Sequence, residues 1–288
     1  MLSDAGPRGQ EVTGLIAGRG SLPVELATAV KARRHLLVCV ALEGADAALD
    51  RLADHIYQVQ FGQLAEAIVA LRRHGATRVL VAGGVARTDL LKQGDALYQR
   101  SMGELRDRRD QVVFTHLTAR MRELGLEVIS PLEFVPDLAV SPGVLSRRAP
   151  TDDEWDDVVL GMTVARVLAA QDVGQTVVLK RGVILAVEAA EGTDATIRRG
   201  GAMASGAIVV KAARPKQDAR FDLPTIGAQT IALLTELHAS VLAVEAGKTL
   251  LLERSQALAT ADQAELAIVG VDVASLSSLR PRPSETGG

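Results

Sequence analysis

The sequence has very few aromatic residues and a single cysteine. Phe, Tyr and Trp make up 2% of the 288 residues, so the core must be built from aliphatic side chains. Proteins that bind single-stranded nucleic acid stack bases on exposed aromatic rings, which are scarce here. The lone Cys39 excludes a disulfide within the chain and a zinc site made of thiolates. We therefore expect a protein of a reducing, cytoplasmic compartment with an aliphatic core.

The sequence also lacks an excess of positive charge and a long apolar run. Its net charge is −3 and its pI is about 6.0, whereas nucleic-acid-binding domains are usually basic, so we expect no nucleic-acid partner. Residues 223–235 form the longest stretch without a charged residue or histidine, and they include Pro224. A membrane-spanning helix needs about 20 apolar residues, so none is expected. The first residues lack the basic and apolar regions of a signal peptide.

Strands and helices alternate in the first half of the chain. Short apolar runs typical of buried strands are followed by stretches with helical spacing, which predicts βαβ units and a mainly parallel sheet. We expect a Rossmann-like domain over residues 12–135. Its predicted strands are 12–17, 35–42, 56–61, 78–82 and 126–129, and its predicted helices are 22–34, 64–74 and 89–125.

The second half has a different pattern, which predicts an α+β domain with a mixed sheet over residues 136–273. The turn Lys180–Gly182 between two apolar runs indicates a β-hairpin. A second turn is expected at 245–248. The other predicted elements are a helix over 152–171, a strand over 207–211, a helix over 262–266 and a strand over 267–271. Residues 274–288 are rich in Ser, Pro and Gly and are expected to be a disordered tail.

Two glycine-rich turns follow predicted strands of the first domain. Gly18 and Gly20 follow the first strand, and Gly83 and Gly84 follow the strand over 78–82. Glycine lets backbone N–H groups approach a phosphate at a helix N-terminus, although each turn could also be only a tight connection. The dinucleotide pattern G-x-G-x-x-G would need glycine where Pro23 stands, which disfavours an oxidoreductase. Because both turns fall at one sheet edge, we expect them to line a single nucleotide crevice.

Acidic and basic residues are interleaved in two segments, 188–199 and 211–227, that each follow a predicted strand. Cations can neutralise phosphoryl oxygens while a carboxylate positions a water molecule or a divalent metal, so this mixture favours phosphate-ester hydrolysis. Simpler interpretations remain open, because Thr193 and Asp194 could cap a helix and two arginines could complement its dipole. The candidate residues are Glu191, Thr193, Asp194, Arg198, Arg199, Lys211, Lys216, Gln217, Asp218, Asp222 and Thr225.

Six segments together resemble the LpxI family, the UDP-2,3-diacylglucosamine pyrophosphatases of lipid A biosynthesis in Gram-negative bacteria. The resemblance spans about residues 12–272. The segments are Gly14–Pro23, Ala82–Gly84, Ser146–Pro150, Asp172–Gln175, Val187–Arg199 and Lys211–Gly227.

The resemblance implies a two-domain fold with the ligand between the domains, and hydrolysis of UDP-2,3-diacylglucosamine to UMP and 2,3-diacylglucosamine 1-phosphate (lipid X). It implies attack on the sugar-side phosphorus, a divalent cation such as Mg²⁺, and Asp222 as the catalytic acid that holds the metal or the water. In this interpretation Asp218 and Asp194 are further catalytic candidates, and Arg198, Arg199, Lys211 and Lys216 include the phosphate-binding cations. Glu191, Thr193, Gln217 and Thr225 would contact the substrate, and aliphatic side chains between the domains would hold its acyl chains.

The amphipathic substrate implies peripheral contact with the inner membrane at most, and a homodimer is compatible with the family. One departure concerns Asp110, which is followed by Gln111 where the family often has a second acid. Two alternatives remain open: a phosphohydrolase acting on another nucleotide-sugar, and a non-catalytic nucleotide-binding regulatory protein.

Overall fold

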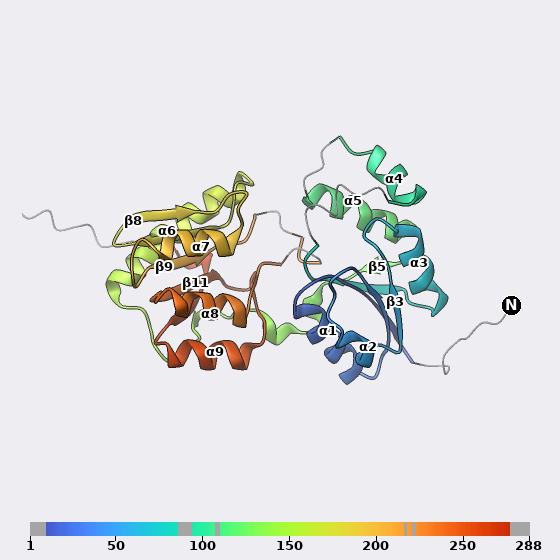
Figure 1. The fold of residues 1–288 in the computed structure, drawn as a ribbon, viewed down its shortest axis with the longest axis horizontal. Helices are drawn as coiled ribbons and strands as arrows, with labels where there is room; N and C mark the ends of the chain where they lie inside the picture. The colour runs from blue at the N-terminus through green and yellow to red at the C-terminus, as the bar shows by residue number, and fades with distance from the viewer. Residues whose placement is uncertain (1–9, 86–93, 107–109, 216–217, 221–222, 277–288) are drawn as a thin grey trace, which may run out of the picture. The chain divides into compact units, whose positions relative to one another are not determined.

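The computed structural model describes residues 10–85, 94–106, 110–215, 218–220 and 223–276, with side chains omitted at 110 and 111 (Figure 1). The chain divides into two compact units. The first unit comprises Met1–Pro136 and Asp218–Asp222, and the second comprises Asp137–Gln217 and Leu223–Gly288. Residues 218–220, which the sequence prediction assigned to the second domain, therefore group with the first unit.

The first unit contains a five-stranded sheet in the order β3-β2-β1-β4-β5, with every neighbouring pair parallel. This confirms the parallel sheet predicted from the alternation of apolar runs and helical stretches. The elements are β1 (Val12–Ala17), α1 (Leu22–Ala32), β2 (Leu36–Ala41), α2 (Leu49–Leu52), β3 (His55–Gln58), α3 (Leu64–Arg73), β4 (Arg78–Ala82), α4 (Ala96–Gly103), α5 (Asp110–Glu123) and β5 (Glu127–Val128).

The chain reverses its direction of winding between β1 and β4. From β1 the chain continues through α1 to β2 on one side, and later returns through α3 to β4 on the other. In sheets of this kind, ligands bind beyond the carboxyl ends of the strands at such a switch point. The two predicted glycine turns follow β1 and β4, so the topology places both of them there.

The core of the first unit is aliphatic, as the composition predicts. One cluster packs Leu71 of α3 and Met121 of α5 against Val38, Val40 and Val79 of the sheet. Cys39 lies in β2 with no exposed surface, and burial raises the pKa of its thiol to about 12. Cys39 is therefore a core residue whose thiol stays protonated at neutral pH.

The second unit contains a six-stranded mixed sheet in the order β6-β13-β11-β9-β7-β8. Strands β9, β11 and β13 are parallel, while β7, β8 and β6 pair antiparallel at the two sides. The elements are β6 (Gly143–Val144), α6 (Asp152–Ala170), β7 (Thr176–Lys180), β8 (Val183–Val187), α7 (Thr193–Gly201), β9 (Ile208–Lys211), β10 (Thr225–Ile226), α8 (Ala228–Glu236), β11 (Val241–Glu245), β12 (Leu250–Leu251), α9 (Arg254–Gln263) and β13 (Ala267–Val271).

This topology confirms the mixed sheet and the β7–β8 hairpin and corrects two details. The helix predicted over 262–266 is α9, which begins at Arg254 and ends at Gln263. Its buried residues are the small alanines Ala257 and Ala261. Their low hydrophobicity gives only a weak helical pattern, so the sequence did not predict the start of this helix. The turn at 245–248 does not join a hairpin, because β11 pairs with β9 and β13 while β12 pairs with β10 in a separate two-stranded sheet.

Helices cover both faces of the six-stranded sheet (Figure 1). Val209 and Leu242 contact the cluster formed with α7, α8 and α9, whereas their neighbours Ile208 and Val241 contact the cluster formed with α6. Side chains alternate between the faces along a strand, so β9 and β11 are apolar at every position before their last residue. The result is a three-layer unit with a continuous aliphatic core.

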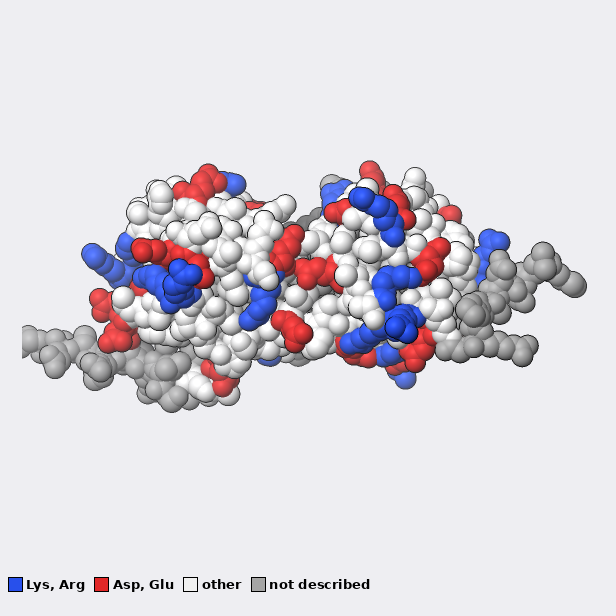
Figure 2. Space-filling view, turned by 90° about the horizontal axis from the view of Figure 1, so that it is seen from below, with Lys and Arg blue, Asp and Glu red and all other residues white. Residues whose placement is uncertain are grey.

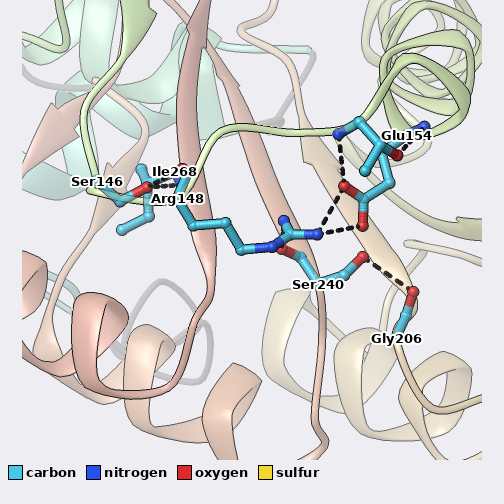
Figure 3. Close-up of polar contacts among 7 residues, drawn as sticks. Ser146, Arg148, Glu154, Gly206, Ser240 and Ile268 are labelled. Atoms are coloured by element: carbon cyan, nitrogen blue, oxygen red, sulfur yellow. Dashed lines mark hydrogen bonds and ion pairs between the residues drawn. The ribbon is translucent and has the colours of Figure 1, made fainter.

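Arg148 connects the segment before α6 to the amino-terminal edge of the sheet (Figure 3). Its guanidinium group donates to both carboxylate oxygens of Glu154 at 2.8 Å and to the carbonyl oxygen of Ser240 at 3.0 Å. Glu154 also accepts from the backbone N–H of Thr151, whose hydroxyl caps α6. The Ser146–Pro150 segment, which contributes to the family resemblance, thus has a structural role in this network.

We expect Glu154 to give the stability of the second unit a pH dependence. Burial raises the pKa of Glu154, but hydrogen bonds from Arg148 and from the Thr151 backbone outweigh that effect and leave the pKa below its usual value. A lowered pKa in the folded state stabilises the protein above the unfolded value, and the contribution disappears as pH falls through the folded value. Glu154→Gln should lower the free energy of unfolding by about 1–3 kcal/mol at pH 7 and by much less near pH 3.

Urea unfolding at the two pH values measures this difference. Asp153→Asn is the matched control, because Asp153 is an exposed acid in the same first turn of α6. An equal loss of stability at both pH values for Glu154→Gln would contradict the assignment.

The face of the molecule in Figure 2 carries Lys and Arg side chains interspersed with Asp and Glu. Among the described residues, neither sign of charge forms a continuous stripe on that face. Within the described ranges, no helix is long and apolar enough to cross a membrane.

Candidate functional site

The two glycine turns of the first unit are joined by backbone hydrogen bonds. The N–H of Gly18 donates to the carbonyl oxygen of Ala82 at 2.8 Å, and Arg19 and Gly84 exchange a pair of bonds at 2.9 and 2.8 Å. A Cβ atom on Gly18 would lie 2.6 Å from the Gly84 oxygen. One on Gly83, whose φ is +91°, would lie 2.6 Å from the Gly18 carbonyl carbon. The expectation that both turns lie at one place on the sheet edge is thus confirmed, and glycine is required for their close approach.

The first turn of α1 lies directly after these glycines. Ser21 stands at the N-cap position without a side-chain capping bond, and Pro23 occupies the first turn. Gly20 has a φ of +101° and open space around its Cα. A glycine turn that leads into an uncapped helix N-terminus is an arrangement suited to an anion. The nucleotide-binding role of Gly18, Gly20, Gly83 and Gly84 stays a prediction.

In the second unit, four buried polar side chains gather at the edge of the sheet where β8, β9 and β11 end. Lys211 is the last residue of β9 and Glu245 the last residue of β11, with exposed fractions of 8% and 3%. Thr176 begins β7 and Glu188 directly follows β8, and they are 0% and 9% exposed. A buried charge is costly unless it is paired or hydrogen-bonded, so the partners of these groups matter.

The partners are loop backbone groups and neighbouring side chains. Lys211 Nζ donates to the carbonyl oxygen of Thr225 at 3.2 Å. Glu245 accepts from the N–H of Ala213 at 3.0 Å through Oε2 and pairs with Lys248 at 2.8 Å through Oε1. Both acidic and basic groups therefore hold the segment that follows β9 in place, and they connect it to β10 and β11.

Gln175 bridges the two segments that the sequence analysis singled out. Its N–H donates to Glu188 Oε2 at 3.2 Å, and its carbonyl oxygen accepts from the N–H of Ala212 at 2.9 Å. Glu188 Oε1 also accepts from the hydroxyl of Thr193 at 3.0 Å. The segments 188–199 and 211–227 are thus brought to the same edge of the sheet, as their positions after predicted strands indicated.

Gly174 is the residue that allows this bridge, and its replacement gives a test. A Cβ atom there would lie 2.1 Å from the carbonyl oxygen of Glu188. We expect Gly174→Ala to push the two segments apart and to lower the free energy of unfolding by about 3 kcal/mol. Urea unfolding checks the loss, with Gly103→Ala as the control because a Cβ on Gly103 meets nothing within 4 Å. Equal stabilities of the two variants would contradict the bridge.

Helix α7 begins differently from the expectation. Thr193 and Asp194 do not cap it, because Gly192 stands at the N-cap position with a φ of 84° and no side-chain cap is formed. Thr193 instead turns its hydroxyl to Glu188, and Asp194 is exposed in the first turn. Helix α8 likewise begins after Gly227 without a side-chain cap. The N–H of Ala228 in the first turn of α8 nevertheless donates to Glu253 Oε2 at 3.3 Å, whereas no side-chain cap is formed at the start of α7.

The two arginines near the end of α7 are engaged with carboxylates. Arg199 pairs with Glu191 at 2.6 Å and donates to the carbonyl oxygen of Val187 at 2.9 Å. A bond from the backbone of Glu191 itself, and then the Arg199 guanidinium, lower the pKa of the Glu191 carboxyl. Arg198 pairs with Glu236 at 3.3 Å, and both of these side chains are exposed. Phosphate binding by either arginine would exchange one of these partners, and it stays a prediction.

Asp218 belongs to the first unit and forms a close pair with Arg220. Its Oδ2 lies 2.5 Å from Arg220 Nη2, its Oδ1 lies 2.9 Å from Arg220 Nε, and the Arg220 side chain is the largest cause of a lowered pKa of Asp218. The hydroxyl of Ser130 donates to the carbonyl oxygen of Ala219 at 3.1 Å. Lys216, Gln217 and Asp222 lie outside the described residues, as do the side chains of Asp110 and Gln111.

The described residues do not by themselves form a magnesium site. They include no group of three His, Cys, Asp or Glu side chains close enough to share an ion. Both oxygens of Asp218 accept from Arg220, and both oxygens of Glu188 and of Glu245 are used in the contacts described above. Magnesium is often held by one or two carboxylates together with phosphate oxygens of a substrate. Binding of a divalent cation stays a prediction.

The sequence analysis singled out the segment that begins at Glu188 but assigned no role to Gln175 or Glu245. Glu188 and Glu245 share a signal, because each is a polar residue at the end of an otherwise apolar strand. This signal could have identified Glu245, whereas Gln175 precedes β7 and has no such signal.

Comparison with known proteins gives matches over both units. The family model of the LpxI N-terminal domain matches residues 12–138, and that of the LpxI C-terminal domain matches residues 141–269. A curated protein of Caulobacter vibrioides, named UDP-2,3-diacylglucosamine pyrophosphatase LpxI, is 33% identical over 273 residues, which are 90% of this chain and 97% of that protein. With both domains matched in order and with this identity over nearly its full length, the chain belongs to the LpxI family.

Proposed function

We propose that this protein hydrolyses the pyrophosphate bond of UDP-2,3-diacylglucosamine to UMP and 2,3-diacylglucosamine 1-phosphate (lipid X), as a step of lipid A biosynthesis. The observation that carries the proposal is the 33% identity, over 90% of the chain, to a protein with that named activity. The sheet edge in the second unit supports it, because Lys211 and the N-terminus of α7, which has no side-chain cap, can neutralise phosphate oxygens.

The proposed reaction is an attack of water on the sugar-side phosphorus. A new P–O bond forms to the water oxygen, the bond from that phosphorus to the bridging oxygen breaks, and UMP leaves with the bridging oxygen. We propose that Asp222 orients the water or holds Mg²⁺, which when bound would neutralise charge on the phosphate oxygens. Asp218 and Asp194 are weaker candidates, because Asp218 is paired with Arg220 and Asp194 is exposed on α7.

The proposed substrate contacts are the candidate residues of the sequence analysis. In this proposal Gly18, Gly20, Gly83 and Gly84 line the nucleotide crevice, Thr193 and Thr225 contact the substrate near Lys211, and the remaining contacts come from Glu191, Arg198, Arg199, Lys216 and Gln217. Because the substrate is amphipathic, the enzyme would act in the cytoplasm and touch the inner membrane at most peripherally. A homodimer fits this proposal but is not required by it.

Hydrolysis in ¹⁸O-labelled water tests the reaction. Mass spectrometry should find UMP without label and lipid X with one ¹⁸O atom in its phosphate group. Label in UMP would mean attack on the nucleoside-side phosphorus. Release of UDP instead of UMP would contradict the proposed pyrophosphatase activity. A folded protein that leaves this substrate intact but cleaves another nucleotide-sugar would support the alternative phosphohydrolase.

A further inference from the structure

The first unit contains an apolar cavity of about 110 Å³ beside the two glycine turns. Gly18 and Gly83 form part of its wall, next to Ile16 of β1 and Val81 of β4. No Asp, Glu, Lys, Arg or His is among the described residues that line it. The cavity therefore lies at the switch point of the sheet, where a ligand of the doubly wound fold is expected.

Helix α5 provides one wall of this cavity with a single face. Phe114, Leu117, Thr118 and Met121 all line it, at the spacing i, i+3, i+4 and i+7 that places side chains on one side of a helix. Aromatic residues are scarce in the chain, yet Phe61 and Tyr98 also line the cavity, with ring centroids 5.9 Å apart in an edge-on arrangement. Large apolar side chains are thus concentrated around an open space instead of filling it.

The chemistry of the lining favours an aliphatic ligand. The volume is enough for on the order of eight water-sized spheres, but a buried water needs two to four polar partners, and apolar cavities stay dry and bind apolar molecules. The side chains with polar groups in the lining are Gln60, Gln63, Thr118 and Tyr98. Gln63 Oε1 accepts from the Gln60 N–H at 2.7 Å, and the Thr118 hydroxyl donates to the Thr115 carbonyl oxygen at 2.9 Å. A uracil ring, with several donors and acceptors, is poorly matched to such a wall.

We propose that this cavity takes the end of one acyl chain of the substrate and determines the chain length that the enzyme accepts. The inference rests on the proposed function, because that substrate carries two acyl chains. It places one of them inside the first unit. The glycine turns at the wall let the polar part of the substrate approach the backbone, while Phe114, Leu117 and Met121 limit how far the chain extends.

Two substitutions should shift the chain-length preference in opposite directions. Leu117→Trp fills part of the cavity. We therefore expect KM to rise at least tenfold for the substrate with the longest acyl chain that the wild type accepts. KM should change little for a substrate whose chain is four carbons shorter. Phe114→Ala enlarges the cavity and should favour longer chains. The matched control is Ala119→Trp, which puts the same bulky side chain on an exposed position of α5. The proposal would be overturned if the folded Leu117→Trp and Phe114→Ala proteins had the same dependence of KM on acyl-chain length as the wild type.

A photochemical experiment separates this inference from the proposed function. The wild-type protein is irradiated with a UDP-2,3-diacylglucosamine whose acyl chains end in a diazirine, and the attached peptides are mapped by mass spectrometry. UMP release from the same compound is measured in parallel. Attachment to the α5 peptide containing Phe114–Met121 supports the acyl site whether or not UMP appears. Attachment only elsewhere, or attachment of 4-thio-UMP to that peptide, would overturn it even if hydrolysis proceeds.

Discussion

Asp222→Asn is expected to lower the rate of UMP release from UDP-2,3-diacylglucosamine by about a thousandfold or more while leaving the stability unchanged within about 0.5 kcal/mol. The substitution keeps the size of the side chain and removes its negative charge. A neutral amide binds Mg²⁺ more weakly than a carboxylate and does not act as a base toward water, and losing a positioned acid–base group costs about 10²–10⁴ in rate. The measurement is single-turnover UMP release, with urea unfolding as the check on folding.

The other two acidic candidates are the controls for this prediction. Asp218→Asn removes the ion pair with Arg220, and Asp194→Asn changes an exposed residue in the first turn of α7. We expect each of them to reduce the rate by less than about tenfold, because the described contacts of neither carboxylate leave it poised for proton transfer. A greater loss in Asp218→Asn than in Asp222→Asn would transfer the catalytic role to Asp218.

Gly83→Ala and Gly84→Ala are expected to differ sharply although the two residues are neighbours. A methyl group on Gly83 meets the Gly18 backbone at 2.6 Å, and the φ of +91° is unfavourable for any residue with a side chain. Strain of this kind costs about 1–3 kcal/mol, and overpacking adds a similar amount, so the loss should be about 3–5 kcal/mol. A methyl group on Gly84 meets nothing within 4 Å, so that variant should change stability by less than about 1 kcal/mol.

Urea unfolding of the two variants measures this difference, and substrate affinity gives a second readout. If Gly83→Ala still folds at low temperature, its KM should rise because the turn next to β1 has moved. Equal stability of the two variants would contradict the tight packing of the β1 and β4 turns.

Much of the fold could be predicted because local patterns agree with tertiary structure in this chain. The run over 35–42 is apolar at every position, and β2 within it is buried on both faces. Lys180–Gly182 indicated the hairpin of β7 and β8 because the turn residues are adjacent in sequence. Pairing between β10 and β12 gave no such signal, since residues far apart in the chain form it. The early start of α9 was missed because alanines pack against the core there without a strong apolar pattern.

The candidate site was only partly predictable from sequence. The positions of the glycine turns after strands were enough to place them at one sheet edge, since parallel strands share their carboxyl ends. The sequence does not show which charged residues support the loops, because this depends on distances between side chains and backbone groups in the folded protein. Glu188 and Glu245 face backbone N–H groups of Gln175 and Ala213, and these contacts depend on how the whole sheet brings its strands together.

The most direct test of the central claim is a comparison of two rates of UMP release by the purified wild-type protein. One rate is measured with UDP-2,3-diacylglucosamine and the other with unacylated UDP-glucosamine. The account predicts UMP release from the acylated substrate that stops when Mg²⁺ is removed with EDTA and is at least a hundredfold slower without acyl chains. The account would be contradicted if the folded protein released no UMP from the acylated substrate in the presence of Mg²⁺. Equal rates with the two substrates would also contradict it.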